Sequence, residues 1–146
     1  LPGFPDVFNF YNIGATPDPS VPNGALVNGA RFALYGRDPD GRAITPDEEE
    51  ILLPWLSRRS AILGGALWIA RGYIAVGQDT LYLQKFDVEE EGGLFLHQYA
   101  QNLQMAESEA LRHAGAYRRL GLLDRPMIFR IPIFRDMPAA PAPRPR

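Results

Sequence analysis

A helical pattern that contains two adjacent glycines constrains the fold of this chain most strongly. Between residues 57 and 76, apolar side chains recur at three- and four-residue spacing, which is typical of a helix with one apolar face. Gly64 and Gly65 lie in the middle, and each costs about 1 kcal/mol relative to alanine. Because the glycines carry this cost, we expect that they allow another backbone or a ligand to approach the helix closely. We expect the buried face to comprise Ile62, Ala66, Ile69, Tyr73 and Val76.

Further helical patterns predict a mainly α chain. Residues 96–120 return to helical spacing, and Gly121 follows as the residue that ends the helix. A shorter helix begins at Asp79 or Thr80, because both residue types cap helices well. Residues 128–131 alternate like a strand or an extended segment.

Three residues predict where one more helix begins. Thr45 suits the capping position, Pro46 suits the first helical position, and Glu48 can reach back to the cap. The acidic residues around them do not form a calcium loop. Arg42 replaces a ligand, and Ala43 replaces the central glycine that such a loop requires.

Size and composition fit one domain over residues 1–138, followed by a proline-rich tail at 139–146. The net charge of −2 offers no cationic face, so we expect no nucleic acid as a partner. Cysteine is absent and the two histidines lack zinc-binding spacing, so we expect no metal and no cofactor. No apolar run reaches the ~18 residues of a transmembrane helix.

Side-chain amides and tyrosines lie close together in the sequence and suit a hydroxyl-rich ligand. Tyrosine rings stack on apolar ligand faces, and carboxamides both donate and accept hydrogen bonds. The alternative for each amide is a buried role in which it satisfies backbone groups. The amides near Tyr11, Tyr82 and Tyr99 are Asn9, Asn12, Gln78, Gln84, Gln98 and Gln101.

Four blocks of the sequence carry a family resemblance: PGFPDVFNFYNIGAT, AILGGALWIARGYIAVGQDTLYLQKFDV, HQYAQNLQMAESEALRHAGAYRRLGLL and FRIPIFRDMP. In this order they resemble the clostridial-type endo-β-N-acetylglucosaminidases of glycoside hydrolase family seventy-three, and NIGA and GQDTLYLQKF are the most specific parts. The resemblance implies a mainly helical, lysozyme-like α+β domain that hydrolyses the β-1,4 bond after N-acetylglucosamine in peptidoglycan. It also implies an autolysin that is secreted and acts in the bacterial cell wall.

The general acid that the resemblance implies has no counterpart in this chain. In the family it is a glutamate on a helix upstream of the Pro-Gly-aromatic block, whereas this chain starts at Leu1 without an initiator methionine or a secretion signal. We therefore expect the C-terminal portion of a catalytic domain, without its N-terminal helices and inactive alone. Trp55, Trp68 and Ile69 would then form an exposed apolar patch that binds a companion chain or a second copy.

The remaining site residues are carried over from the resemblance. Tyr82 resembles the family's active-site tyrosine and would orient the acetamido oxygen as an internal nucleophile; inverting attack by water is the alternative. Asp79 borders the same groove, either as an orienting base or as a helix cap. The predicted substrate-binding residues are Asn9, Tyr11, Asn12, Gln78 and Gln98. A second function stays open: a non-catalytic glycan-binding or interaction module that keeps the groove without the acid.

Overall fold

The computed structural model describes residues 3–37, 44–88 and 94–140, and these contain helices but no strand. The prediction of a mainly α chain is confirmed. Residues 128–131 are extended without strand pairing. The helices are α1 (Gly24–Tyr35), α2 (Pro46–Glu50), α3 (Arg58–Gly72), the 3-10 helix η1 (Ile74–Val76), α4 (Leu81–Phe86) and α5 (Met105–Arg119).

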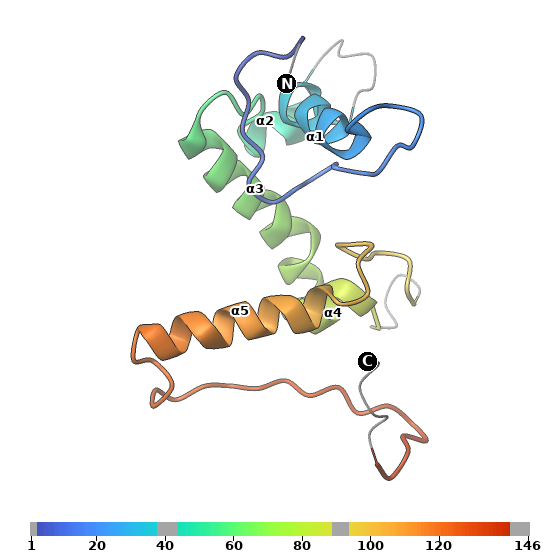
Figure 1. Cartoon of the computed structure of the whole chain (residues 1–146), viewed down its shortest axis with the longest axis vertical. Helices are drawn as coiled ribbons and strands as arrows, with labels where there is room; N and C mark the ends of the chain where they lie inside the picture. Colours follow the sequence, from blue (N-terminus) through green and yellow to red (C-terminus); the bar gives the residue numbers. More distant parts are fainter. Residues whose placement is uncertain (1–2, 38–43, 89–93, 141–146) are drawn as a thin grey trace.

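Helix α3 connects two ends of the molecule (Figure 1). The opening loop, α1 and α2 gather around its first half, whereas α4 and α5 lie beyond its second half and contact each other. After α5 the chain runs back in an extended path toward α4. Two contacts hold this return: Arg130 pairs with Asp79, and the ring of Phe134 lies 6.5 Å from that of Tyr82.

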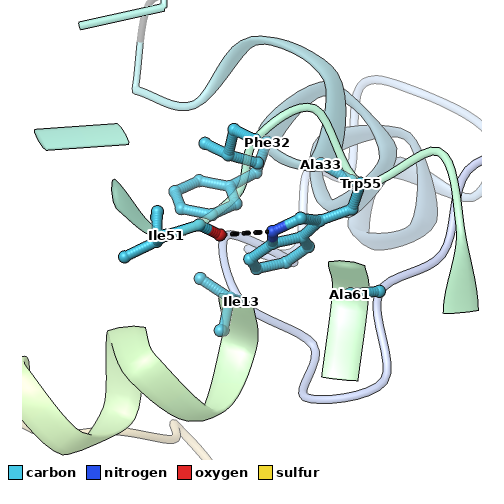
Figure 2. Close-up of a cluster of buried hydrophobic side chains, with 7 residues drawn as sticks. Ile13, Phe32, Ala33, Ile51, Trp55 and Ala61 are labelled. Atoms are coloured by element: carbon cyan, nitrogen blue, oxygen red, sulfur yellow. Dashed lines mark hydrogen bonds between the residues drawn. The ribbon is translucent and has the colours of Figure 1, made fainter. Parts of the chain in front are cut away.

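The hydrophobic core lies around Trp55, which is fully buried (Figure 2). Its indole Nε1 donates a 2.8 Å hydrogen bond to the carbonyl of Ile51, and its ring packs against Phe32. Trp68 and Ile69 are half-buried. The prediction that Trp55 belongs to an exposed patch is therefore wrong, because the opening loop, α1 and the segment before α3 enclose it.

The glycine pair in α3 makes the close contacts that the sequence predicts. A Cβ at Gly64 would lie 2.0 Å from the carbonyl oxygen of Ile51, and one at Gly65 would lie 2.3 Å from the Tyr11 ring. The predicted buried face is nevertheless wrong at Ile62, Ala66 and Val76, which are exposed. The helix instead buries Ala61 with the two glycines, because a surface of small residues allows the closest approach.

The start of α2 is confirmed as predicted. The Glu48 carboxylate accepts hydrogen bonds of 3.0 Å from the Thr45 amide and hydroxyl and of 2.7 Å from the Arg37 amide. Burial acts to raise the pKa of Glu48, but these hydrogen bonds outweigh it and hold the pKa below its ordinary value. Residues 38–43, which include the rejected calcium-loop positions Arg42 and Ala43, lie outside the described ranges.

Two other helix starts differ in detail from the sequence prediction. Helix α4 is capped by Thr80, whose hydroxyl accepts the Leu83 amide at 3.1 Å. The capping role considered for Asp79 is therefore wrong. The second long helix starts at Met105 instead of residue 96, because the preceding segment forms a loop that bonds to α4.

Candidate functional site

A cleft of about 740 Å³ lies where the opening loop, α3, α4 and α5 meet. Its walls combine aromatic rings, carboxamides and, along α5, charged side chains. Such a mixture of apolar surface with a few convergent polar groups is typical of a small-molecule site. The lining residues include Phe10, Tyr11, Asn12, Ile69, Leu81, Gln84, Tyr99, Gln101, Asn102, Met105, Glu109, Arg112 and His113.

Two tyrosines from distant parts of the sequence form one wall of the cleft. The Tyr99 hydroxyl donates a 2.7 Å hydrogen bond to the backbone carbonyl of Tyr11. The Tyr11 ring rests on the bare backbone of Gly65, which is why α3 needs a glycine there. Burial, followed by the nearby Tyr73, Tyr11 and Glu109, raises the pKa of Tyr99 to about 12. Tyr99 therefore stays a neutral hydrogen-bond donor at any physiological pH.

Gln84 places an unpartnered carboxamide in the cleft. The residue is only 9% exposed and lines the cavity wall, yet its side chain makes no hydrogen bond to any described residue. No fully buried side-chain polar atom in the described ranges lacks a partner, so the Gln84 amide keeps some solvent access, and the cleft is the cavity that this residue lines. A buried amide normally finds a partner. Gln84 is therefore positioned to receive one from a ligand.

Lys85 fixes the loop that carries Tyr99. Its side chain is almost fully buried, and Nζ donates hydrogen bonds of 2.8 Å to Gln98 Oε1 and 2.6 Å to the Ala100 carbonyl. Gln98 is predicted from the sequence to bind substrate. In the structure it accepts the Lys85 hydrogen bond and is not among the residues that line the cleft.

Two more of the predicted amides are occupied within the fold. Asn9 donates both of its amide hydrogens to the carbonyls of Ile13 and Gly29, at 2.7 and 3.0 Å. Gln78 is 2% exposed and bonds to the Leu83 and His97 carbonyls and to the His97 ring. Both fit the alternative in which an amide satisfies buried backbone groups.

The structure does not bring Tyr82 and Asp79 into the cleft. Tyr82 is half-buried on α4, with its ring 4.8 Å from that of Phe86 and 6.5 Å from that of Phe134. Asp79 pairs with Arg130 of the returning C-terminal segment. Of the predicted site residues, Tyr11 and Asn12 line the cleft.

Sequence reasoning missed the charged side of the cleft. Met105, Glu109, Arg112 and His113 all line it, and Glu109 pairs with Arg112. Their i, i+4, i+7, i+8 spacing places them on one face of α5, which is the signal that could have found them. The apolar pattern of 96–120 had drawn attention to other positions on this helix.

A second cavity, of about 470 Å³, lies between the opening loop and α1. Its lining is mixed: Phe8, Ala25 and Leu26 lie beside Asp6 and Asn9, so the predicted substrate-binding residue Asn9 lines this cavity. Asn12 and Ala15 line both cavities, so the two adjoin at the turn that these residues form.

Neither a metal centre nor a membrane span is found in the part of the chain that the structure describes. No group of three histidine, aspartate or glutamate side chains there is placed to hold a metal ion. No helix there is both long and apolar enough to cross a membrane.

Comparison with known proteins finds similarity to bacterial autolysins. A bifunctional autolysin of Staphylococcus epidermidis is 29% identical over 127 residues, and one of Staphylococcus aureus is 32% identical over 90 residues. These matches cover 87% and 62% of this chain, but only 8% and 7% of the autolysins. No protein-family model and no solved structure matches the chain.

Proposed function

We propose that this chain holds peptidoglycan glycan strands in the cell wall of a bacterium, outside the cell, as part of an enzyme that hydrolyses the β-1,4 bond after N-acetylglucosamine. The observation that carries the proposal is the Gln84 carboxamide, buried and unpartnered in a cleft whose other walls include Tyr11 and Tyr99. Similarity to staphylococcal bifunctional autolysins supports this choice of ligand.

The chemistry of the cleft suits an acetylated amino sugar. Aromatic rings stack on the apolar faces of sugars, and a carboxamide can bond to a hydroxyl and to an acetamido group at once. Gln84 supplies one such carboxamide to the cleft, and Asn12, Gln101 and Asn102 add further amides to its lining. A ligand that bonds to Gln84 would take the place of water at this accessible amide.

Hydrolysis also requires a carboxylic acid that protonates the leaving oxygen. Glu109 is the acidic side chain among the described cleft residues, and it is held in an ion pair with Arg112 on the same helix. We therefore propose that the general-acid glutamate comes from a segment outside these 146 residues, which fits the family seventy-three resemblance. The chain alone would bind glycan without cleaving it.

Catalytic roles for Tyr82 and Asp79 remain part of this proposal. Tyr82 lies on α4 and Asp79 just before it, and Leu81 and Gln84 of this helix line the cleft. Ligand contact by Tyr82 and Asp79 would therefore require their contacts with Phe134 and Arg130 to open. Tyr82→Phe and Asp79→Asn should then lower cleavage by an active, upstream-extended protein. Unchanged cleavage in both variants would exclude these roles.

The proposal is tested by binding of the chain to purified, peptide-stripped glycan strands. We expect saturable binding that falls about tenfold in Gln84→Ala, because a buried hydrogen bond to ligand is lost. Gln104→Ala is the matched control, since Gln104 is exposed and lies outside the cleft. Absence of binding by the unmodified chain would contradict the proposal. Release of muropeptides by an upstream-extended protein would establish hydrolysis.

The alternative function is a non-catalytic glycan-binding or interaction module. The ion pair between Glu109 and Arg112 is as compatible with this module as with a general acid supplied from outside the 146 residues. A companion chain that supplies the acid is an intermediate case. Glycan binding with no hydrolysis from any upstream extension or added companion would select the binding module.

A further inference from the structure

The returning segment, residues 126–134, has the backbone of a β-strand without a partner strand. It is extended up to the turn at Arg135 (Figure 1), and none of its backbone groups bonds to another described residue. An exposed, unpaired strand edge is a template for pairing with another chain. We propose that this segment pairs with the same segment of a second copy, antiparallel and centred on Ile131, so that the chain forms a symmetric dimer.

The two faces of the returning segment differ. Side chains alternate along an extended chain, so even-numbered and odd-numbered residues point to opposite faces. On the even face Arg130 pairs with Asp79, and the Phe134 ring lies 6.5 Å from that of Tyr82. The odd face carries three apolar side chains that are between 78% and 88% exposed: Phe129, Ile131 and Ile133. The even face therefore holds the segment beside α4, and the odd face is left open to solvent.

The apolar pattern of the segment is symmetric about Ile131. The stretch IFRIPIF has two apolar residues at each end, and antiparallel pairing about its centre places Ile131 opposite the same residue of the second copy. Phe129 then lies opposite Ile133, an aromatic and β-branched pair that stabilises antiparallel strands. Pairing about Arg130 would place two arginines opposite each other, which is destabilising. The sequence thus favours a second copy as the partner, with Ile131 on the two-fold axis.

Pro132 fits this pairing because of its position. Along a strand, the N–H and C=O groups of successive residues point to opposite edges. If the groups of Ile131 face the second copy, those of Phe129 and Ile133 face it too, whereas Pro132 lies with its missing N–H toward the other edge. Proline is tolerated at such positions of an edge strand. The other edge cannot pair fully, so the assembly closes at two copies.

The test is sedimentation equilibrium of the whole chain over a range of concentrations. We expect the average mass to rise from that of one chain toward that of two, and no further. Ile131→Pro removes the N–H on the two-fold axis and should weaken the dimer at least ~tenfold. Ile128→Pro is the matched control, because it loses the same side chain but an N–H that points to the other edge. It should leave the dimer nearly unchanged.

Neither proline variant should unfold the chain. Ile128 is 97% and Ile131 78% exposed, and both lie in a segment whose N–H groups bond to no described residue. Unchanged helical circular dichroism checks this expectation. A chain that stays monomeric at every concentration would overturn the inference. A dimer that Ile131→Pro leaves intact, or that both variants weaken equally, would overturn it as well.

Opposite charges test the register of the pairing. Phe129→Glu and Ile133→Lys should each weaken self-association, because each places a charge opposite an apolar side chain. Mixed together, the two variants should form a heterodimer, since the new carboxylate at position 129 faces the new ammonium at position 133. Phe129→Glu mixed with Ile133→Glu is the control and should not associate. Association in the control mixture equal to that in the charge-paired mixture would contradict the register centred on Ile131.

Discussion

The hydroxyl of Tyr99 donates a 2.7 Å hydrogen bond to the carbonyl of Tyr11, a residue 88 positions earlier in the chain. This bond joins the loop before α5 to the opening loop, and both loops line the same cleft. The Lys85 ammonium bonds to the Ala100 carbonyl and so fixes the loop before α5. The Tyr11 ring of the opening loop packs directly on Gly65 of α3. The ligand wall thus depends on contacts between residues far apart in the sequence.

Tyr99→Phe should destabilise the fold by about 1 kcal/mol, the usual contribution of one hydrogen bond. The Tyr11 carbonyl loses its side-chain donor, whereas the Phe ring keeps the packing against Tyr73. Urea unfolding measures the change, and glycan affinity should fall with it because the cleft wall loosens. Tyr117→Phe on the exposed side of α5 is the control and should leave both quantities unchanged. Identical effects of the two variants would show that the Tyr99 bond carries no stability.

Alkaline unfolding should report on the same tyrosine. The pKa of Tyr99 is raised from 10.0 to about 12, primarily by burial, so the fold favours the neutral phenol. Its contribution to stability is fully present below pH 10 and is lost as pH rises from 10 to 12, where the unfolded chain releases the proton first. The free energy of unfolding across this interval should fall less steeply in Tyr99→Phe. An equal slope in both proteins would contradict the assignment.

Gly65→Ala should destabilise the protein by about 1–3 kcal/mol through overpacking. The new methyl would lie 2.3 Å from the Tyr11 ring, which can move only by leaving its place in the cleft wall. Gly72→Ala at the end of the same helix is the matched control. A Cβ there meets nothing within 4 Å, so that variant should be neutral or gain up to about 1 kcal/mol. Thermal unfolding separates the two, and equal melting temperatures would contradict the close contact.

Local sequence signals predicted the fold well where the interaction is local. The Thr45–Glu48 cap depends on residues three apart, and the cost of Gly64 and Gly65 in a helix indicated the close approach before any partner was known. The buried face of α3 was predicted wrongly because apolar periodicity favours large side chains. The actual contact uses the small ones, Ala61 among them.

The candidate site depended on long-range contacts and was predicted only in part. Tyr11 and Asn12, two of the predicted substrate-binding residues, line the cleft, but no spacing rule could show that Asn9 would bond to Gly29 or that Tyr82 would pack near Phe134. A side-chain amide looks the same in the sequence whether it bonds to buried backbone groups or is free to bond to a ligand. Tertiary contacts alone distinguish the two cases.

Glu48→Gln should destabilise the protein by about 1–2 kcal/mol, because a charged acceptor of three hydrogen bonds becomes a neutral one. The pKa of Glu48 lies below its ordinary value of 4.5, so its contribution is present above pH 4.5 and is lost as pH falls through the lower folded value. Urea unfolding should therefore show a smaller acid-dependent loss of stability in Glu48→Gln than in the unmodified chain. Glu49→Gln is the control, since Glu49 is exposed on the same short helix. If both variants kept the full acid dependence, the Glu48 carboxylate would not be the group that joins the end of α1 to the start of α2.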